Sequence, residues 1–402
     1  MKITVEKGFA SGCVKAPPSK SIAHRALISA ALSDGSKVSN VEYSDDINAT
    51  LNCLELMGAK ITRNKDSVFA GGLNAFNIEN NITLDCFESG STLRFIVPLC
   101  LLNGRRVNLK GTRRLFERPL NIYEDICKKQ SLLFERREGG LTLCGRLSPG
   151  DYSVPGNISS QFISGLLFTL PLLGKGSIIR LTETTESISY IFLTLKVISD
   201  FGISAEYKDN CLKIPGCQKY LQNDYIVEGD YSNAAFIDAL NVIGGNVTVT
   251  GLNKDSLQGD SVYKKMFSEL KMGKRSFDLS DCPDLAPVMF ALAAVFGKTE
   301  FSGTARLKIK ESDRAAAMKE ELLKFGVTTQ IFENRVVVNG GKILPPNQPL
   351  CSHNDHRIVM ALAILSTLTG GTIENAEAIN KSFPGFFDVL EAVGIGIIKN
   401  ET

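Results

Sequence analysis

The feature that most constrains the fold of this chain is a phrase that recurs six times along it. An apolar run with the length of a helix is followed by a glycine and then, in most copies, by Val, Ile or Thr. The six runs are residues 25–35, 92–104, 161–174, 234–244, 285–297 and 357–370. Helices that are apolar nearly all round lie inside a domain rather than on its surface. The repeat therefore predicts six buried helices.

A second, amphipathic kind of helix lies between the buried runs. Several of these helices end on a hydrophobic residue followed by glycine, at Gly58, Gly202, Gly326 and Gly394. A glycine at that position supplies the left-handed conformation that ends a helix before the next strand. The repeating unit is therefore a strand, a buried helix, a strand and an outer helix.

The six units are expected to form two groups of three, because a period of roughly seventy residues is long for a solenoid. The length of 402 residues also favours two domains. A stretch with Pro, Gly and Asn at residues 215–223 marks the division. One spacing is short, between Gly244 and Gly297. The alternative is a row of α/β hairpins without symmetry, and the constant order of helix and glycine disfavours it.

Composition indicates a soluble globular protein, with 44% hydrophobic and 22% charged residues. A net charge of +2 gives no overall field for nucleic acid or an anionic membrane. The longest apolar stretches, such as residues 285–296, are shorter than the ~18 residues of a membrane span. Residues 1–7 alternate like a strand and lack the apolar core of a signal peptide. We therefore expect no nucleic-acid or membrane partner.

Ten cysteines are scattered from Cys13 to Cys351, without a C-x-x-C pair and without metal-ligand spacing. Cysteine is among the residues most often buried in proteins. We expect reduced, mostly buried thiols, and neither a metal nor a cofactor.

Reactive side chains gather where the buried helices begin. They are Lys20, Ser21 and Arg25; Ser91, Thr92 and Arg94; Ser159, Ser160 and Gln161; Asp284; and Asp355, His356 and Arg357. A helix N-terminus presents unpaired N–H groups and a partial positive charge, so a Lys or Arg beside it makes an anion site. Several such sites together predict a polyanionic substrate.

Each of these residues taken singly has a structural interpretation. Ser21, Ser159 and Ser160 are typical helix N-caps. Residues 311–314 fit the acidic first turn of an exposed helix, with Arg314 in solvent. His24 and His356 lie beside apolar helix faces and fit hydrogen-bonded structural residues.

Eight segments in the same order resemble the motifs of the 5-enolpyruvylshikimate-3-phosphate synthase family. They are residues 18–21 (PSKS) with His24 and Arg25, then 89–94 (SGSTLR), 117–119 (ERP), 159–162 (SSQF), 283–284 (PD), 310–314 (KESDR), 354–357 (NDHR) and 381–384 (KSFP). Each motif is weak alone, but the eight together span the chain at matching intervals.

The resemblance implies an α/β fold of two similar domains, each with three βαβαββ units around a pseudo-threefold axis. Domain I would comprise residues 1–14 and 224–402, and domain II residues 15–223. The active site would lie in the cleft between the two domains. Two crossovers, near residues 15–19 and 220–224, would act as hinges for closure.

The reaction that the resemblance implies is transfer of the enolpyruvyl group from phosphoenolpyruvate to the 5-hydroxyl of shikimate 3-phosphate. It releases phosphate by addition and elimination, in the shikimate pathway to chorismate. Such chemistry needs cations for two phosphates and two carboxylates, a proton donor for the methylene carbon and a base for the hydroxyl. A cytoplasmic, monomeric enzyme of bacterial type is the corresponding expectation.

The resemblance also assigns residues to each ligand. Shikimate 3-phosphate would contact Lys20, Ser21, Arg25, Ser159, Ser160, Gln161, Ser187, Asp284 and Lys310. Phosphoenolpyruvate would contact Lys20, Gly90, Arg118, Gln161, Arg314, Arg357 and Lys381. Asp284 is the candidate base, Glu311 with Lys310 would deliver the proton to the methylene carbon, and Lys20 completes the catalytic set. Arginine suits these ligands because its planar fork meets carboxylate and phosphate oxygens with paired hydrogen bonds.

The chain departs from the family pattern at three positions. Glu88 stands where an Asn is frequent, Arg306 replaces a common Asn and Lys308 a common Arg. The family's inhibitor glyphosate occupies the phosphoenolpyruvate site, and Gly90, in place of a bulkier residue, favours sensitivity to it.

Two other functions compete with this interpretation. The related enzyme that transfers enolpyruvyl to UDP-N-acetylglucosamine typically has Lys-Asn where this chain has Lys20 and Ser21, and a reactive Cys that residues 110–117 lack. A non-catalytic sugar-phosphate-binding protein would need no base, so Asp284, Lys310 and Glu311 disfavour it.

Overall fold

The computed structural model describes residues 1–400, which divide into two compact units. One comprises Met1–Pro17 with residues 229–400, and we call it the terminal unit. The other comprises Pro18–Glu228, and we call it the central unit. Each has a hydrophobic core of its own.

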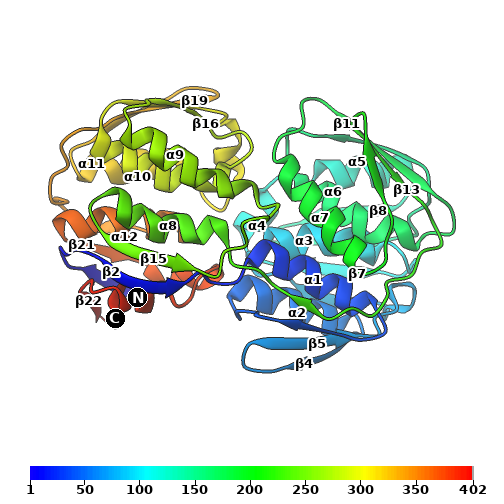
Figure 1. Cartoon of the computed structure of the whole chain (residues 1–402). Helices are drawn as coiled ribbons and strands as arrows, with labels where there is room; N and C mark the ends of the chain where they lie inside the picture. Colours follow the sequence, from blue (N-terminus) through cyan, green and yellow to red (C-terminus); the bar gives the residue numbers. More distant parts are fainter. Residues whose placement is uncertain (401–402) are drawn as a thin grey trace. The chain divides into compact units, whose positions relative to one another are not determined.

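The central unit contains three four-stranded sheets, each accompanied by a buried helix and a second helix (Figure 1). The first sheet, in the order β14-β3-β5-β4, comprises β3 (Ser36–Ser39), β4 (Lys60–Arg63), β5 (Ser67–Gly71) and β14 (Tyr225–Ile226), with α1 (Lys20–Leu32) and α2 (Asp45–Leu56). The second, β6-β7-β9-β8, comprises β6 (Ile82–Asp85), β7 (Val107–Lys110), β8 (Leu133–Arg137) and β9 (Gly140–Cys144), with η1 (Ala75–Asn77), α3 (Gly90–Cys100), α4 (Arg113–Glu117) and α5 (Asn121–Lys129). The third, β10-β11-β13-β12, comprises β10 (Asp151–Pro155), β11 (Ser177–Thr182), β12 (Glu206–Lys208) and β13 (Cys211–Ile214), with α6 (Ser160–Thr169), η2 (Leu170–Leu172) and α7 (Ile188–Asp200).

The third sheet displays the repeating topology without interruption. Its strand β10 runs parallel to β11, and β13 pairs antiparallel with both β11 and β12. Parallel neighbours need a crossover connection, and the buried helix α6 supplies it. The order along the chain is therefore βαβαββ, and the hairpin β12–β13 closes the unit.

The terminal unit repeats this plan in two four-stranded sheets, one of which takes its strand β1 from the N-terminal segment, and shortens it in a sheet of two strands. One sheet, β16-β17-β19-β18, comprises β16 (Ser276–Asp278), β17 (Thr299–Ser302), β18 (Thr328–Ile331) and β19 (Arg335–Asn339), with η4 (Pro283–Leu285), α10 (Ala286–Phe296), η5 (Ala305–Ile309) and α11 (Arg314–Lys324). Another, β20-β21-β1-β22, comprises β1 (Lys2–Val5), β20 (Leu350–Cys351), β21 (Gly371–Glu374) and β22 (Ile397–Asn400), with α12 (His356–Thr369), η6 (Ala376–Lys381) and α13 (Phe386–Ala392). The last, β15-β2, comprises β2 (Ser11–Lys15) and β15 (Asn246–Thr250), with α8 (Tyr231–Val242), η3 (Gly259–Val262) and α9 (Tyr263–Lys271).

The two-stranded sheet explains the short spacing between Gly244 and Gly297. No hairpin follows α9 within the described residues, because the next strand, β16, already belongs to the following sheet. The partner of β15 is β2, from the N-terminal segment, and the two strands are parallel. This pairing continues as far as Lys15, so β2 lies wholly in the terminal unit.

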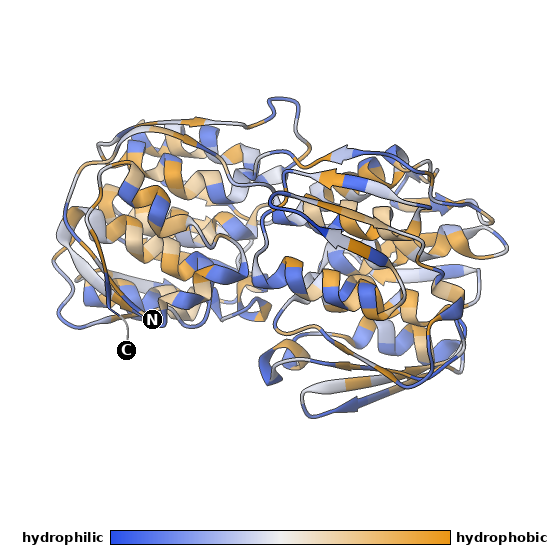
Figure 2. Cartoon of the chain, turned by 90° about the horizontal axis from the view of Figure 1, so that it is seen from below, coloured by the Kyte–Doolittle hydropathy of each residue, from blue (hydrophilic) through white to orange (hydrophobic). Residues whose placement is uncertain are grey.

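The six predicted buried helices are confirmed as α1, α3, α6, α8, α10 and α12. Every residue of α10 from Ala286 to Ala294 is buried, and so is every residue of α12 from His356 to Thr367. Helices α8, α10 and α12 pack against one another, as do α3 and α6, with the sheets outside them (Figure 1). Figure 2 shows hydrophobic residues concentrated along these enclosed helices.

The glycine caps of the second kind of helix are also confirmed. Gly202 after α7 has φ 82° and Gly394 after α13 has φ 92°, both in the left-handed region that favours glycine. Helix α7 is amphipathic as predicted: Ile191, Val197 and Ile198 are buried against the core of the central unit, while Phe192, Lys196 and Ser199 are exposed.

Ten free cysteines are present, and five of them are buried: Cys53, Cys86, Cys100, Cys127 and Cys282. Residues 1–400 include no helix that is both long and apolar enough to cross a membrane.

Candidate active site

Asp284 is the centre of a charged set in the terminal unit. It lies in η4, directly before the buried helix α10. Its Oδ1 accepts from Arg314 Nη1 at 2.7 Å and lies 3.4 Å from Lys310 Nζ, while Oδ2 accepts from Arg357 Nη2 at 3.0 Å. Three cations from three different loops and helices therefore converge on one carboxylate.

A second carboxylate, Asp355, holds the Arg314 guanidinium and caps the helix that carries Arg357. It is fully buried and is the N-cap of α12, where its Oδ1 accepts from the Arg357 backbone N–H at 2.9 Å. Its Oδ2 accepts from Arg314 Nε at 2.9 Å and from Ser312 Oγ at 3.1 Å. The alternative interpretation of Arg314 as a solvated residue of an exposed helix is therefore wrong: its side chain is 2% exposed and donates to both Asp284 and Asp355.

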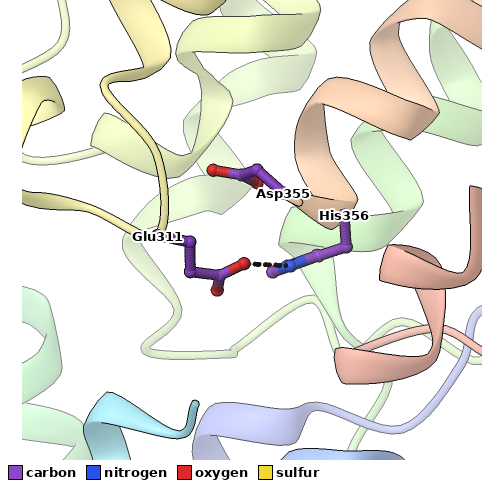
Figure 3. A group of neighbouring side chains, drawn as sticks. All are labelled: Glu311, Asp355 and His356. Carbon is purple, nitrogen blue, oxygen red and sulfur yellow. Dashed lines mark hydrogen bonds and ion pairs between the residues drawn. The ribbon is translucent and has the colours of Figure 1, made fainter. Parts of the chain in front are cut away.

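Glu311 and His356 form a third contact of this set (Figure 3). His356 Nδ1 lies 2.9 Å from Glu311 Oε2, and the imidazole is buried while the carboxylate is partly exposed. The interpretation of His356 as a hydrogen-bonded residue is confirmed. Nearby in sequence, the backbone oxygen of Asn354 accepts from Lys381 Nζ at 2.5 Å. Lys381 is thus tied to the loop that carries Asp355 and His356.

Electrostatics keep the two aspartates ionised. Burial by itself would raise the pKa of Asp284, but Arg357, Lys310 and Arg314 lower this pKa well below its ordinary value. Burial would likewise raise the pKa of Asp355, and Arg314 is the main cause that lowers it. Both carboxylates are therefore charged at neutral pH, although Asp355 is buried and Asp284 is only partly exposed.

In the central unit, Lys20 opens α1 and pairs with Asp46 of α2. Lys20 Nζ lies 2.7 Å from Asp46 Oδ2, with side chains 14% and 10% exposed. Sequence reasoning selected Lys20 but missed Asp46, although an acid in the first turn of the next helix was a visible signal. Ser19, rather than Ser21, is the N-cap of α1, so Ser21 is a residue of the first helical turn.

Arg25, one turn further along α1, is buried among neutral oxygens. It donates from Nε to Thr194 Oγ1 at 2.8 Å, and from Nη2 to Ser164 Oγ and the Tyr190 carbonyl, each at 3.3 Å. Nη1 donates to the Ser21 carbonyl at 2.6 Å. Burial lowers the pKa of Arg25 to about 10.

A second buried arginine, Arg94 of α3, positions Gln161. Arg94 Nη1 donates to Gln161 Oε1 at 2.7 Å, and Gln161 Nε2 donates to Ser91 Oγ at 2.9 Å. Ser159 caps α6 by accepting from the Gln161 backbone N–H, which confirms its structural role. Arg94 was not among the predicted ligand residues, although it belongs to the SGSTLR motif.

Four predicted residues remain to be placed in the central unit. A Cβ added to Gly90 would lie 2.5 Å from Arg118 Nη1, so the guanidinium lies directly against the start of α3. Ser160 is the buried first residue of α6. Ser187 is the N-cap of α7, buried and in the left-handed region with φ 56°.

Two groups of side chains have the donor types of a metal site. They are Glu311 with Asp355 and His356, and Glu320 with Glu321 and His353, in each case with donor atoms within 4.8 Å of one another. Protein cations already occupy the buried acids of both groups: Arg314 binds Asp355, and Lys324 lies 2.9 Å from Glu321 Oε1. The donor sets therefore fit internal ion pairs better than a divalent cation.

The fold is an α/β protein of two repeated units with buried cationic side chains in each, and its architecture is known. EPSP synthase from Acinetobacter baumannii matches with a TM-score of 0.80 over 99% of this chain and 100% of that chain, at 21% identity. A second structure of EPSP synthase from the same organism matches with a TM-score of 0.81 over the whole of both chains, at 20% identity. At this identity the likeness establishes the fold.

Sequence comparison then gives the family. The family model described as EPSP synthase (3-phosphoshikimate 1-carboxyvinyltransferase) matches residues 6–390. The 3-phosphoshikimate 1-carboxyvinyltransferase of Clostridium beijerinckii is 42% identical, covering 98% of this chain and 97% of the relative. That of Clostridium kluyveri is 40% identical, covering 95% of each. This chain belongs to the EPSP synthase family.

Proposed function

We propose that this chain transfers the enolpyruvyl group of phosphoenolpyruvate to the 5-hydroxyl of shikimate 3-phosphate and releases phosphate. Family membership supports the reaction, and one observation carries the residue roles. Asp284 is an ionised, nearly buried carboxylate surrounded by Arg314, Arg357 and Lys310. A site that only bound anions would gain nothing from an acid at its centre, whereas a base for a hydroxyl must lie beside the bound anions.

Phosphoenolpyruvate is assigned to Arg314, Arg357 and Lys381 of the terminal unit, and to Arg118, Gln161 and the backbone of Gly90 in the central unit. Arg357 supports this assignment because its Nε and Nη1 are buried and have no hydrogen-bond partner within residues 1–400. Buried guanidinium donors without partners cost free energy that an incoming carboxylate or phosphate recovers.

Shikimate 3-phosphate is assigned to Lys20, Ser21, Arg25, Ser159, Ser160, Gln161 and Ser187, with Asp284 and Lys310 from the terminal unit. The positive charge of Arg25, buried among neutral oxygens, supports a phosphate ligand nearby. Since the reaction needs both ligands at once, the proposal includes that the two sets of residues serve one reaction.

The proton steps follow from the chemistry. In the addition, a proton moves from Glu311 or Lys310 to the methylene carbon, the hydroxyl oxygen bonds to C2, and Asp284 accepts the hydroxyl proton. In the elimination, the C2–O bond to phosphate breaks as the departing phosphate takes the proton held by Asp284, and a methyl proton returns to Glu311 or Lys310, which regenerates the double bond. His356 hydrogen-bonds Glu311 at 2.9 Å and so holds it in place. Lys20 adds positive charge for the phosphate that departs.

The test is phosphate release by the purified protein given phosphoenolpyruvate and shikimate 3-phosphate. Parallel reactions contain UDP-N-acetylglucosamine in place of shikimate 3-phosphate, or the Asp284→Ala variant. We expect release with shikimate 3-phosphate alone, an equal rate in EDTA, and loss in the variant. Release only with the nucleotide sugar, or with neither acceptor, would overturn the proposal.

A monomeric state and a cytoplasmic location belong to the same proposal. Ten cysteines without a disulfide support a reducing compartment. Sedimentation of the purified protein tests the monomer, because a dimer would double the measured mass.

A further inference from the structure

Asp260 is a buried acid that the roles above do not use. It lies in η3 and is 1% exposed. Its Oδ2 accepts from Ser232 Oγ, but its Oδ1 is buried and has no hydrogen-bond partner within residues 1–400. A buried carboxylate oxygen without a donor is costly when it is charged. Such an atom calls for an explanation beyond packing.

The backbone around Asp260 is fixed, so the carboxyl cannot turn toward solvent by a simple loop shift. Gln258 joins η3 to the start of α8: its Nε2 donates to the Gly229 carbonyl at 2.8 Å, and its Oε1 accepts from the Tyr231 N–H at 3.0 Å. Ser232, which donates to Asp260, is in the first turn of the same helix. Asp260 is thus held in place on both sides.

Charges of both signs act on Asp260 from the elements packed around it. Burial is the largest cause that raises its pKa, and Asp284 of η4 and Asp230 before α8 raise it further. Arg357 of α12 and the Ser232 hydrogen bond lower it, and the balance places the pKa at about 7. Asp260 in turn raises the pKa of the buried thiol of Cys282, before η4.

Arg357 links Asp260 to the active site. Its Nη2 bonds Asp284 at 3.0 Å, whereas its buried Nε and Nη1 have no hydrogen-bond partner within the described residues. In the empty site the attraction of Arg357 favours the charged form of Asp260. An anion that binds Arg357 adds negative charge beside the same carboxyl and opposes this attraction.

We propose that Asp260 is a positioning residue for Arg357. In the empty site the Asp260 carboxylate balances the positive charge of Arg357. When phosphoenolpyruvate binds, Asp260 takes up one proton and no longer attracts the guanidinium. This inference rests on the proposed assignment of phosphoenolpyruvate to Arg357. The proton comes from solvent and bonds to a carboxylate oxygen of Asp260, and no other bond is made or broken. The charge of Asp260 falls to zero as the charge of the ligand arrives.

The consequence is a pH dependence of ligand binding. Above the pKa of Asp260 in the empty protein, each binding event consumes a proton, so KM for phosphoenolpyruvate should rise about tenfold per pH unit. The turnover number kcat should change much less, because Asp260 is already protonated in the complex. The phosphate of phosphoenolpyruvate, with a second pKa of about 6, is largely ionised above pH 7, so its own titration adds little to this trend.

The experiment measures kcat and KM for phosphoenolpyruvate between pH 7 and pH 9 at saturating shikimate 3-phosphate. In Asp260→Asn, which keeps the shape and the acceptor for Ser232, KM should vary less than about twofold across this range. Ser232→Ala removes a hydrogen bond that lowers the pKa of Asp260, so the rise in KM should begin at higher pH. Asp255→Asn, at an exposed position before η3, is the matched control and should behave like the wild type.

Each outcome decides the inference. The inference is supported if KM in Asp260→Asn hardly changes with pH and the rise of KM in Ser232→Ala begins at a higher pH than in the wild type. If KM for phosphoenolpyruvate in Asp260→Asn rises with pH as in the wild type, or is higher than in the wild type by the same factor at every pH, the inference is overturned. Asp260 is then a structural residue. If Asp260→Asn does not fold, an unshifted rise in Ser232→Ala overturns the inference. A wild-type protein without turnover would instead reject the proposed function, and this inference with it.

Discussion

The charged residues of the two units are neutralised in different ways. In the terminal unit, Arg314 and Arg357 bind the carboxylates of Asp284 and Asp355. Although burial lowers the pKa of Arg314, the two acids raise it above its ordinary value. In the central unit, Arg25 donates to hydroxyl and carbonyl oxygens, and burial lowers its pKa to about 10.

Arg94 of the central unit follows Arg25 in this respect. It donates to the Gln161 side chain and the Pro119 carbonyl, and burial together with the charge of Arg118 lowers its pKa well below the ordinary value. The terminal set is therefore organised by its own acids before any ligand arrives. In the central unit Lys20 also has an acid partner, Asp46. The buried arginines Arg25 and Arg94, however, donate to neutral oxygens and hold charge that a ligand anion would relieve. This contrast fits a catalytic base in one unit and a phosphate site in the other.

The strongest test of the contrast is removal of the acid at the centre of the terminal set. Asp284→Asn keeps the size of the side chain but removes the base, so kcat should fall by about 10²- to 10⁴-fold. Phosphate release under saturating substrates measures it. Asp388→Asn, at an exposed position in α13, is the control and should keep full activity. A variant within twofold of the wild type would refute the role of Asp284 and the contrast built on it.

The next test compares stability. Asp355→Asn leaves Arg314 buried without one of its acids and should lower the free energy of unfolding by about 3 kcal/mol. Asp46→Asn in the central unit breaks a more exposed pair and should cost about 1 kcal/mol. Urea unfolding of both variants measures the difference.

The sign of the pH dependence sharpens this comparison. The pKa of Asp355 is lowered in the folded protein, so its contribution is present above the ordinary pKa of an aspartate and is lost as the pH falls through the lowered value. The gap between wild type and Asp355→Asn should therefore be complete at pH 6 and shrink below about pH 4. A gap that is constant down to pH 3 would show that the charge of Asp355 is not what stabilises the unit.

A third test concerns the relief of buried charge by a ligand. Shikimate 3-phosphate at a hundred times its Kd should raise the free energy of unfolding by about 2.7 kcal/mol. Hydrogen exchange should show the gain in α1 and α7, whose side chains surround Arg25, more than in α10 or α12. Arg25→Met should lose the protection, while Arg63→Met, a partly exposed arginine of the same unit, should keep it. Greater protection in α10 and α12 than in α1 and α7 would contradict the idea that the ligand relieves buried charge in the central unit.

The smallest expected effect tests the geometry of Arg118. Gly90→Ala places a methyl group 2.5 Å from the present position of Arg118 Nη1, so the guanidinium must move. We expect KM for phosphoenolpyruvate to rise about tenfold with a smaller change in kcat, since about 1.4 kcal/mol is a typical loss for one shifted charged hydrogen bond. Gly174→Ala, where the added methyl meets no atom within 4 Å, is the control. Equal KM values for the two variants would show that Arg118 does not bind phosphoenolpyruvate.

Much of the fold could be predicted from the sequence because the signals are local. An apolar run long enough for a helix, such as residues 285–297, has to be buried wherever it lies. A glycine such as Gly202 ends a helix through its own backbone conformation, φ 82° here. The candidate site was visible for a related reason: Asp284 and Asp355 stand directly before buried helices, where polar side chains are needed.

The tertiary structure decided what depends on residues far apart in the chain. Sequence alone allowed Arg314 to be a solvated residue of an exposed helix, but Asp355, 41 positions further on, buries it through a 2.9 Å hydrogen bond. The pairing of Lys20 with Asp46, and of β2 with β15, likewise joins segments that no local pattern connects. Periodicity reports whether a residue prefers water or the core. Which charge it meets there is set by the packing of distant elements, and so is the pKa on which its chemistry depends.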